Sequence, residues 1–403
     1  MSHTETSCGI IPQSSVKKDV EDIWIIAGES SGDSYGAKLA EQLFTLNPGL
    51  TISGMGGQAM REAGVELLID STDLGVVGFV EVCKNLPVFV KTFRELTRRA
   101  ESERPDCVVL IDYPGFNIRF AEKLHKLGIP VVYYVSPQVW AWGKRRIPKM
   151  GRIIDKMLVI FPFESDVFAD TSLDIDFVGH PLVEILAKKQ KNLSEPPDRD
   201  LGLLLPGSRH NEVKRLLPPL LETARQLITH HPQSHFIIPT TSNKMYDYIN
   251  DYIQQERNKH TEDIPVKVVR EPAREWLGRA DFGLAASGTV TVEAAIMGLP
   301  LVVVYKLNPV TFWLGRRLVK VPYFTMVNLV ADDLVYEEYL QNDVKPEILV
   351  PALEKIMRHG ARRQKVVRQM NEVVEKLSGK QHACRTAAEK VLETARRNRT
   401  LQA

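Results

Sequence analysis

The sequence has few cysteines and no long hydrophobic run. Its 403 residues include four cysteines, which are scattered and fit neither a metal-ligand spacing nor a disulfide framework: Cys8, Cys83, Cys107 and Cys384. This pattern predicts a reducing, cytoplasmic environment. No apolar run approaches the ~20 residues of a transmembrane helix, and residues 1–20 lack the apolar segment of a signal peptide. We therefore expect a protein that is soluble or that lies on a membrane surface.

An excess of charge of one sign is also missing. The chain has 52 Lys and Arg residues against 50 Asp and Glu residues, which gives a net charge of +2. This balance argues against nucleic acid as a partner, and any anion must be bound by local groups of residues. Hydrophobic residues make up 44% and charged residues 25%, as in ordinary globular proteins, and the length favours two or three domains.

The first half of the chain alternates apolar runs with helix-like segments. The run 23–27 ends at Gly28, and apolar residues then recur every four positions, as on one helix face, at Tyr35, Leu39 and Leu43. Similar runs predict strands at 107–111, 130–135 and 157–160, with a helix from about Ile118 between the first two. Strands and helices that alternate in this way predict a parallel sheet covered on both faces.

The second half repeats the pattern after a charged, proline-containing segment at 187–200, which we interpret as a linker. Strands are expected at 201–205, 236–238, 281–285 and 301–304, with helices at 212–229 and from Thr289. We predict an α/β protein with two Rossmann-like, doubly wound domains at 22–186 and 201–345. A disordered extension (1–21) precedes them, and C-terminal helices (346–403) follow. Because such sheets bind ligands at the carboxyl ends of their strands, the site is expected in a cleft between the domains.

The first candidate motif is IAGESSGD at residues 26–33, where the first strand turns into a helix. Its small residues would let backbone N–H groups approach an anion or a sugar. The residues considered for this contact are Gly28, Glu29, Ser30, Ser31, Gly32 and Asp33. The motif is neither G-x-G-x-x-G nor a P-loop. A tight turn capped by Ser31 or Asp33 explains it equally well.

The second motif is LIDYPGFN at residues 110–117. Asp112 follows a buried strand and precedes a Pro-Gly turn, so its carboxylate is expected to be partly desolvated and to face the cleft. A carboxylate in that position can act as a general base. The alternative is that Asp112 caps a helix starting near Asn117. Because Asn117 could do that itself, we favour the base.

The third motif is LLPGSRHNEV at residues 204–213. Gly207 and Ser208 turn the chain out of a strand and place Arg209 at the start of a helix. The helix dipole disfavours a cation there unless an anion shares the site, which indicates a phosphate partner. A solvated arginine is the alternative.

The fourth motif, AASGTVTVEAAIMGLP at residues 285–300, carries the strongest signal. Ser287, Gly288 and Thr289 offer hydrogen-bond donors at a helix N-terminus, which suits a diphosphate. Glu293 lies one residue too far from Thr289 for a capping box, so its carboxylate is free to accept two sugar hydroxyls. A surface glutamate favoured by the positive helix end is the weaker alternative.

Two further patterns are interpreted as structural. Asp174-x-Asp176 and Asp198-x-Asp200 match the metal-binding D-x-D pattern, but both lie in polar stretches and are expected to be solvated loops. His180 has no partner at metal-ligand spacing, and we expect it to fix the exit from a strand. No metal site is predicted.

In this order along the chain, the motifs resemble those of the lipid-A-disaccharide synthase family, which are glycosyltransferases of the GT-B architecture. The resemblance includes YVSPQVWAWG at 134–143 and FWLGRRLVK at 312–320, and it spans about residues 22–340. It implies an inverting transfer, without metal or cofactor, of diacylglucosamine from UDP to acylated glucosamine 1-phosphate. It also implies a cytoplasmic enzyme held peripherally on the inner face of the inner membrane, and we consider a homodimer.

The resemblance also assigns residues. The family's base falls on Asp112, and its UDP contacts fall on Arg209, Ser287, Gly288, Thr289, Glu293 and Asn328. Some members carry a second acid where this chain has Gly115, so an accessory carboxylate is not expected there. A UDP-sugar epimerase, or another lipid-linked glycosyltransferase of envelope synthesis, would share the architecture. VSPQVWAWG argues against the second of these.

The apolar segment 74–90 has two interpretations. It is either a buried helix or strand pair, or an exposed patch that covers the substrates' acyl chains at the membrane. In the second case the contact residues are Val76, Val77, Phe79 and Val80. Cations elsewhere in the chain would then meet anionic head groups: Lys144, Arg145, Arg146, Arg316, Arg317 and Lys320.

Overall fold

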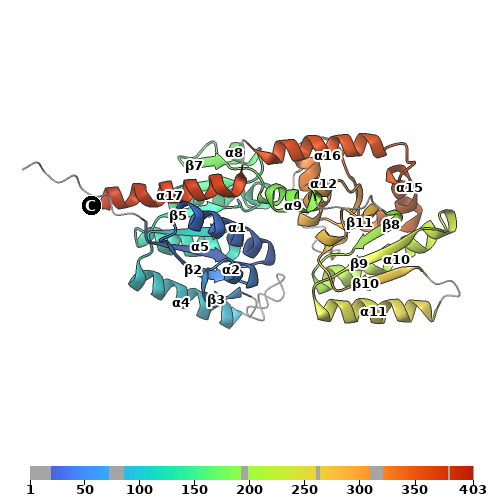
Figure 1. The fold of residues 1–403 in the computed structure, drawn as a ribbon, viewed down its shortest axis with the longest axis horizontal. Coiled ribbons are helices and arrows are strands. Elements are labelled where there is room, and N and C mark those ends of the chain that lie inside the picture. The colour runs from blue at the N-terminus through green and yellow to red at the C-terminus, as the bar shows by residue number, and fades with distance from the viewer. Residues whose placement is uncertain are drawn as a thin grey trace, which may run out of the picture.

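The computed structural model describes residues 20–71, 86–191, 198–259, 264–308, 321–379 and 382–402. The chain forms two lobes, each built on one parallel sheet, as the alternating sequence pattern predicts (Figure 1). Among these residues, no helix is both long enough and apolar enough to cross a membrane.

The N-terminal lobe contains a sheet with the strand order β3-β2-β1-β4-β5-β6-β7, in which every pairing is parallel. The strands are β1 (Asp22–Ala27), β2 (Thr51–Gly56), β3 (Glu66–Asp70), β4 (Cys107–Ile111), β5 (Val131–Tyr134), β6 (Lys156–Val159) and β7 (Asp174–Phe177). The direction of winding reverses between β1 and β4. Such a reversal opens a crevice at the carboxyl ends of the two strands.

Helices cover both faces of this sheet. One face carries α1 (Ser30–Leu46) and α17 (Ala383–Gln402), and the other carries α4 (Leu86–Glu103), α5 (Pro114–Lys126) and α7 (Ile147–Ile153). Alternate residues of β1 therefore enter different cores: Ile23 and Ile25 face α1, whereas Trp24 and Ile26 face α5. Because both faces are buried, β1 is apolar at successive positions instead of alternating with polar residues.

The C-terminal lobe has the strand order β10-β9-β8-β11-β12-β13, again with parallel pairings, and it reverses between β8 and β11. Its strands are β8 (Asp198–Leu205), β9 (His235–Pro239), β10 (Val266–Val269), β11 (Ala280–Ala286), β12 (Leu301–Tyr305) and β13 (Glu337–Leu340). Its longer helices are α10 (His210–His230), α11 (Asn243–Arg257), α12 (Thr289–Met297), α15 (Pro346–Ile356) and α16 (Arg363–Ser378). The short helix α14 (Met326–Ala331) packs against both α12 and α16.

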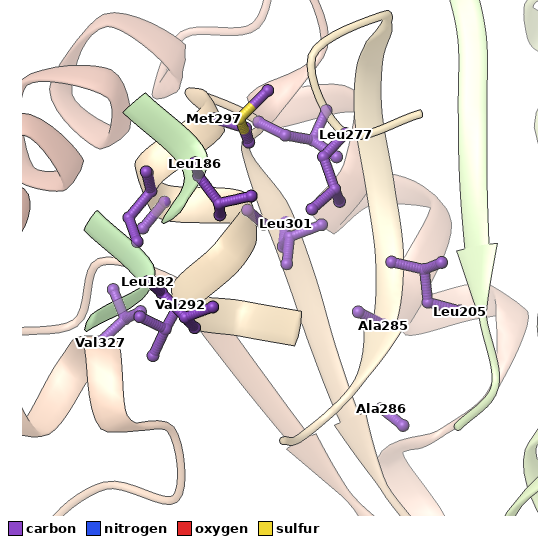
Figure 2. Packing of buried hydrophobic residues seen from close by; sticks show 14 of the residues in the cluster. Leu182, Leu186, Leu205, Leu277, Ala285, Ala286, Val292, Met297, Leu301 and Val327 are labelled. Carbon is purple, nitrogen blue, oxygen red and sulfur yellow. The ribbon is translucent and has the colours of Figure 1, made fainter. Parts of the chain in front are cut away.

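The chain crosses between the lobes twice, and the two crossings touch. α9 (Pro181–Lys191) follows β7 but packs on the C-terminal lobe, where Leu182 and Leu186 join the cluster around Val292 (Figure 2). α16 runs back over the C-terminal lobe, and α17 then lies along the N-terminal lobe against α1 (Figure 1). Gly179 and Gly379 have φ angles of 89° and 62°, and a Cβ atom on Gly379 would lie 3.1 Å from the Cα atom of Gly179, so both crossings favour glycine.

The central strands agree with the sequence predictions, whereas the connections differ. The predicted linker at 187–200 contains regular structure at both ends, because α9 continues to Lys191 and β8 begins at Asp198, and the chain enters the C-terminal lobe before α9. The D-x-D pairs lie in strands and not in the solvated loops that we expected. Asp174 and Asp176 of edge strand β7 lie 2.6 and 2.7 Å from Nζ of the buried Lys156. Asp174 and Asp176 are therefore polar because they form ion pairs with Lys156 on an edge strand.

Candidate functional site

All four sequence motifs lie at the two reversals of strand order. Residues 28–33 follow β1 and Asp112 follows β4, so both flank the reversal in the N-terminal sheet. Arg209 follows β8 and residues 287–289 follow β11, so both flank the reversal in the C-terminal sheet. Doubly wound sheets bind ligands at these positions.

Glycine is required at position 28 because of Tyr113. A Cβ atom on Gly28 would lie 2.3 Å from Cδ1 of the Tyr113 ring, which is impossibly close. The ring therefore covers the turn after β1. Glu29 and Ser30 are exposed at the start of α1, and the N-cap residue Glu29 makes no side-chain cap hydrogen bond. The first N–H groups of α1 are therefore open to a ligand.

Asp33 has a different role from the one predicted. It is buried inside α1, and its carboxylate accepts hydrogen bonds from the N–H groups of Gly57, Ala59 and Met60 at 2.7–3.0 Å. These groups begin α2 (Gln58–Glu62). The carboxylate therefore caps α2, and the predictions that it contacts a sugar or caps its own turn are corrected.

Asp112 lies in strained backbone. The φ angles of Asp112 and Tyr113 are 44° and 47°, and that of Val135, at the end of the neighbouring strand β5, is 65°. Non-glycine residues seldom adopt this region, and a β-branched valine does so least. Hydrogen bonds to the Asp112 carbonyl from Tyr133 Oη (2.5 Å) and Asn117 Nδ2 (2.8 Å) hold the turn. Strain of this kind clusters at functional sites.

The Asp112 carboxylate has the electrostatic properties of a base. Burial raises its pKa from 3.8 to about 7, the charge of Glu29 adds to this effect, and the N–H of Tyr113 opposes it. Such a carboxylate accepts a proton more readily than an ordinary aspartate and is still substantially ionised near neutral pH. α5 begins at Pro114 with Tyr113 as its N-cap, so neither Asp112 nor Asn117 caps it, contrary to the alternative considered.

Arg209 is the N-cap residue of α10, as its motif predicts. The preceding turn uses Gly207 with φ 107°, where a Cβ atom would lie 2.7 Å from the Glu212 carboxylate. The Arg209 side chain is 45% exposed, and its Nη1 lies 3.7 Å from Glu212 Oε1. An exposed ion pair of that length contributes little, so the guanidinium can turn to a phosphate.

The start of α12 is open. Gly288 is the N-cap residue, no side chain occupies the cap, and a Cβ atom there would have no neighbour within 4 Å. Ser287 is less available than predicted: its N–H donates to the Val304 carbonyl (3.2 Å) and its hydroxyl to the Phe324 carbonyl (3.3 Å). The donors that remain for an anion come from Thr289 and the first-turn amides.

Glu293 lies one turn into α12 and does not cap it, as predicted. Burial raises the pKa of its carboxyl group, while the positive charges of Arg274 and Lys189 oppose that rise. The Arg274 Nε atom is buried without a hydrogen-bond partner among the described residues. A half-buried carboxylate flanked by two cations can accept hydrogen bonds from a pair of hydroxyls.

The Asn328 side chain is committed to the protein. Its Nδ2 donates to the Tyr336 carbonyl and to Glu338 Oε1, each at 2.8 Å, and its Oδ1 accepts from the N–H groups of Val335 and Tyr336. All four hydrogen-bonding positions are filled and the side chain is fully buried. The side chain therefore shapes the loop beside Ser287, and a contact of Asn328 with UDP stays a prediction.

Two residues relate the halves of the site to each other. The pKa of the buried Tyr35 on α1 is raised by burial and then by the charges of Glu293 and Asp112, one from each lobe. Gln138, in the VSPQ segment, approaches Met326 of α14, with 3.9 Å between Nε2 and Sδ. The VSPQ segment of the N-terminal lobe therefore contacts the C-terminal lobe at α14.

Sequence reasoning missed Tyr35, Tyr113 and Arg274, because their positions depend on contacts with distant segments. It interpreted His180 correctly: the ring Nδ1 accepts from the Leu182 N–H at 3.2 Å, between β7 and α9, and burial lowers its pKa to about 3.

The described residues contain no cluster of three or more His, Cys, Asp or Glu that could hold a metal. Some predicted membrane contacts lie outside the described residues: Val76, Val77, Phe79, Val80, Arg316, Arg317 and Lys320.

Solved structures of similar fold include a glycosyltransferase and a complex with UDP. A glycosyltransferase of kitacinnamycin superposes with a TM-score of 0.61 at 15% identity, covering 93% of this chain and 99% of that one. The Staphylococcus aureus MnaA–UDP complex superposes with a TM-score of 0.59 at 12% identity, covering 93% and 95%. These similarities establish the two-domain GT-B fold.

Sequence relatives are closer. The lipid-A-disaccharide synthase of Nitrosococcus oceani is 38% identical over 91% of this chain and 94% of its own length. That of Trichlorobacter lovleyi is 38% identical over 89% and 93%. The profile described as lipid-A-disaccharide synthetase matches residues 23–393, which include every motif identified above. On this evidence, the chain belongs to the lipid-A-disaccharide synthase family of glycosyltransferases.

Proposed function

We propose that this enzyme transfers 2,3-diacylglucosamine from UDP to the 6-hydroxyl of 2,3-diacylglucosamine 1-phosphate, with inversion and without a metal. The products are the β-1,6-linked disaccharide 1-phosphate and UDP. One observation carries the proposal: a carboxylate with the properties of a base lies at the reversal of one sheet, and an open helix start lies at the reversal of the other.

In this mechanism the N-terminal lobe binds the acceptor. Asp112 removes the proton of the 6-hydroxyl as the oxygen attacks the anomeric carbon of the donor. Glu29 lies close enough to raise the Asp112 pKa, and thereby strengthens the base. The proton ends on Asp112 and passes to solvent after the product leaves.

The C-terminal lobe binds UDP. Departure of UDP builds negative charge on the diphosphate, which the first-turn amides of α12 and the Arg209 guanidinium stabilise. Glu293 accepts hydrogen bonds from the two ribose hydroxyls. The sugar passes through an oxocarbenium-like transition state. In this state the anomeric carbon is partly bonded to the attacking oxygen on one side and to the leaving diphosphate oxygen on the other.

Mass spectrometry of the reaction products tests the proposed function. Incubation with both acylated substrates should give the disaccharide 1-phosphate and one UDP for each disaccharide. Incubation with the UDP-sugar alone should release no UDP and give no isomer of the donor. Isomerisation without acceptor would instead identify an epimerase.

We also propose that the enzyme acts at the inner face of the inner membrane, where α4 contacts lipid. Val88 and Val90, near the start of α4, are 45% and 37% exposed, whereas Phe89 between them packs on Phe116 with 5.1 Å between ring centroids. The N-terminal end of α4 therefore presents apolar side chains beside Tyr113 and the site. The homodimer stays a prediction.

Replacing both Val88 and Val90 by Ser is expected to weaken binding to phospholipid vesicles several-fold, since each buried CH₂ contributes about 0.8 kcal/mol. Both side chains are exposed, so the fold should be unaffected. Vesicle co-sedimentation measures the effect, and Leu334→Ser, at a residue 39% exposed in the other lobe, is the matched control. Equal binding by all three proteins would refute this membrane contact.

A further inference from the structure

Three consecutive cations follow α6 (Val139–Trp142) along the chain. Lys144, Arg145 and Arg146 form the short 3₁₀ helix η2, and all three are exposed. None of them makes an ion pair with a residue that the structure describes. Lys149, one turn later on α7, is different: its Nζ lies 2.6 Å from Glu122 Oε2 on α5.

The η2 turn lies at the same edge of the sheet as Asp112. β4 pairs with β5, and the chain passes from β5 through α6 to η2 before α7 returns toward the amino edge and β6. Tyr133 Oη donates to the Asp112 carbonyl, and burial raises the pKa of Tyr133 while the charge of Arg146 acts against that rise. Arg146 is thus within electrostatic reach of the tyrosine that holds the base.

The turn is also firmly attached. Val139 is buried, and the Trp140 ring packs edge-on against Phe163 with 5.2 Å between centroids. The N–H of Gly143 donates to the Val139 carbonyl, and the N–H of Arg146 donates to the Gly143 carbonyl, each at 2.8 Å. The three side chains therefore extend from a fixed backbone into solvent beside the crevice.

We propose that Lys144, Arg145 and Arg146 bind the phosphate of the acceptor sugar, with Arg146 as the main contact. This inference rests on the proposed function, in which the acceptor's 6-hydroxyl lies against Asp112. Its 1-phosphate is then held across the sugar ring from the base, at the edge where η2 lies. A phosphate monoester is doubly charged near neutral pH, and a guanidinium binds two of its oxygens at once. The same chemistry could serve anionic lipid head groups, as we first expected from the sequence.

Steady-state kinetics of Arg146→Ala test the proposal. The KM for the phosphorylated acceptor should rise about tenfold or more, because a charge-assisted contact is lost, while the KM for the UDP-sugar stays unchanged. With an acceptor that lacks the 1-phosphate, wild type and variant should perform alike. Arg146→Lys should recover part of the affinity, and Lys149→Ala, which removes a paired cation nearby, should behave as wild type.

Two outcomes would overturn the proposal. The first is an unchanged KM for the phosphorylated acceptor in Arg146→Ala and in the triple alanine variant. The second is an equal loss with both acceptors, which would mean a general disturbance of the turn. Binding to phosphatidylcholine vesicles with and without phosphatidylglycerol separates the lipid alternative: a loss confined to the anionic vesicles, with normal kinetics, assigns η2 to the membrane. Failure of the proposed function is distinct, since the wild type itself would then form no disaccharide.

Discussion

Replacing Asp112 by Asn is expected to lower kcat by about 10²–10⁴-fold, while the affinity for UDP stays close to that of the wild type. Asparagine has nearly the same shape but cannot accept the proton of the 6-hydroxyl. The carbonyl of residue 112 would keep its hydrogen bonds from Tyr133 and Asn117, so the strained turn should persist. Turnover is measured as disaccharide formed, and UDP affinity by calorimetry.

Glu29 provides the control for this result. It is the nearest acidic alternative in the same lobe and is exposed at the start of α1. Glu29→Gln should leave most of the turnover in place if Asp112 is the base. If Asp112→Asn retained most of its activity instead, Asp112 would leave the mechanism and Glu29 would become the candidate.

The pH profile gives the same test a second readout. Asp112 must be ionised to act, so kcat/KM should rise with pH, reach half its plateau near the Asp112 pKa of about 7, and then level off. Glu29→Gln removes a negative charge that raises this pKa, so the midpoint should move to lower pH. A midpoint that does not move would mean that another group controls the acid limb.

Replacing Glu293 by Ala is expected to weaken UDP binding by roughly tenfold to over a hundredfold, since a charge-assisted hydrogen bond contributes about 1.5–3 kcal/mol. The carboxylate is half-buried near Arg274 and Lys189 and does not cap α12, so a ligand role explains its position best. Calorimetry with UDP measures the loss. Glu293→Gln, which keeps an acceptor without the charge, should fall between the alanine variant and the wild type.

Glu347→Ala is the matched control in the same lobe. Glu347 lies in the first turn of α15 and is exposed, so it shares the favourable position of an acid near a helix start. Its replacement should affect stability slightly and UDP binding not at all. Unchanged UDP affinity in a folded Glu293→Ala protein would remove Glu293 from the nucleotide site.

The sequence predicts the centre of each sheet better than its edges. β4 is a continuous apolar run, and β11 is apolar or small at every position after Asp281, because helices cover both faces of these strands; such runs can be recognised without the structure. Edge strands have one open side and accept charge. β7 reads Asp-Ile-Asp-Phe because its acids pair with Lys156, and β13 reads Glu-Glu-Tyr-Leu. Neither could be told from a loop by its apolar pattern.

The residues of the candidate site likewise divide into those that the sequence predicts and those that it does not. Asp112, Arg209 and Glu293 could be identified because each stands at a fixed place relative to a strand end. Other polar residues at the turns have hydrogen-bond partners elsewhere in the chain, and the local sequence does not predict these partners. Asp33 accepts a hydrogen bond from the N–H of Gly57, 24 residues away, and Asn328 donates one to the carbonyl of Tyr336, eight residues further along the chain. A polar residue at a turn can therefore serve either a ligand or a distant helix, and only its tertiary contacts decide.

The placement of α17 sets a limit on the order in which the protein can fold during its synthesis. This helix completes one face of the N-terminal sheet, where it covers α1 with buried residues such as Ala387 and Val391. The N-terminal lobe therefore cannot be finished until α17 has been made, although its own strands end at Phe177. At about 5–20 residues per second, roughly 10–40 s pass between α9 and the end of α17. During that interval the apolar side of α1 must be protected by other means.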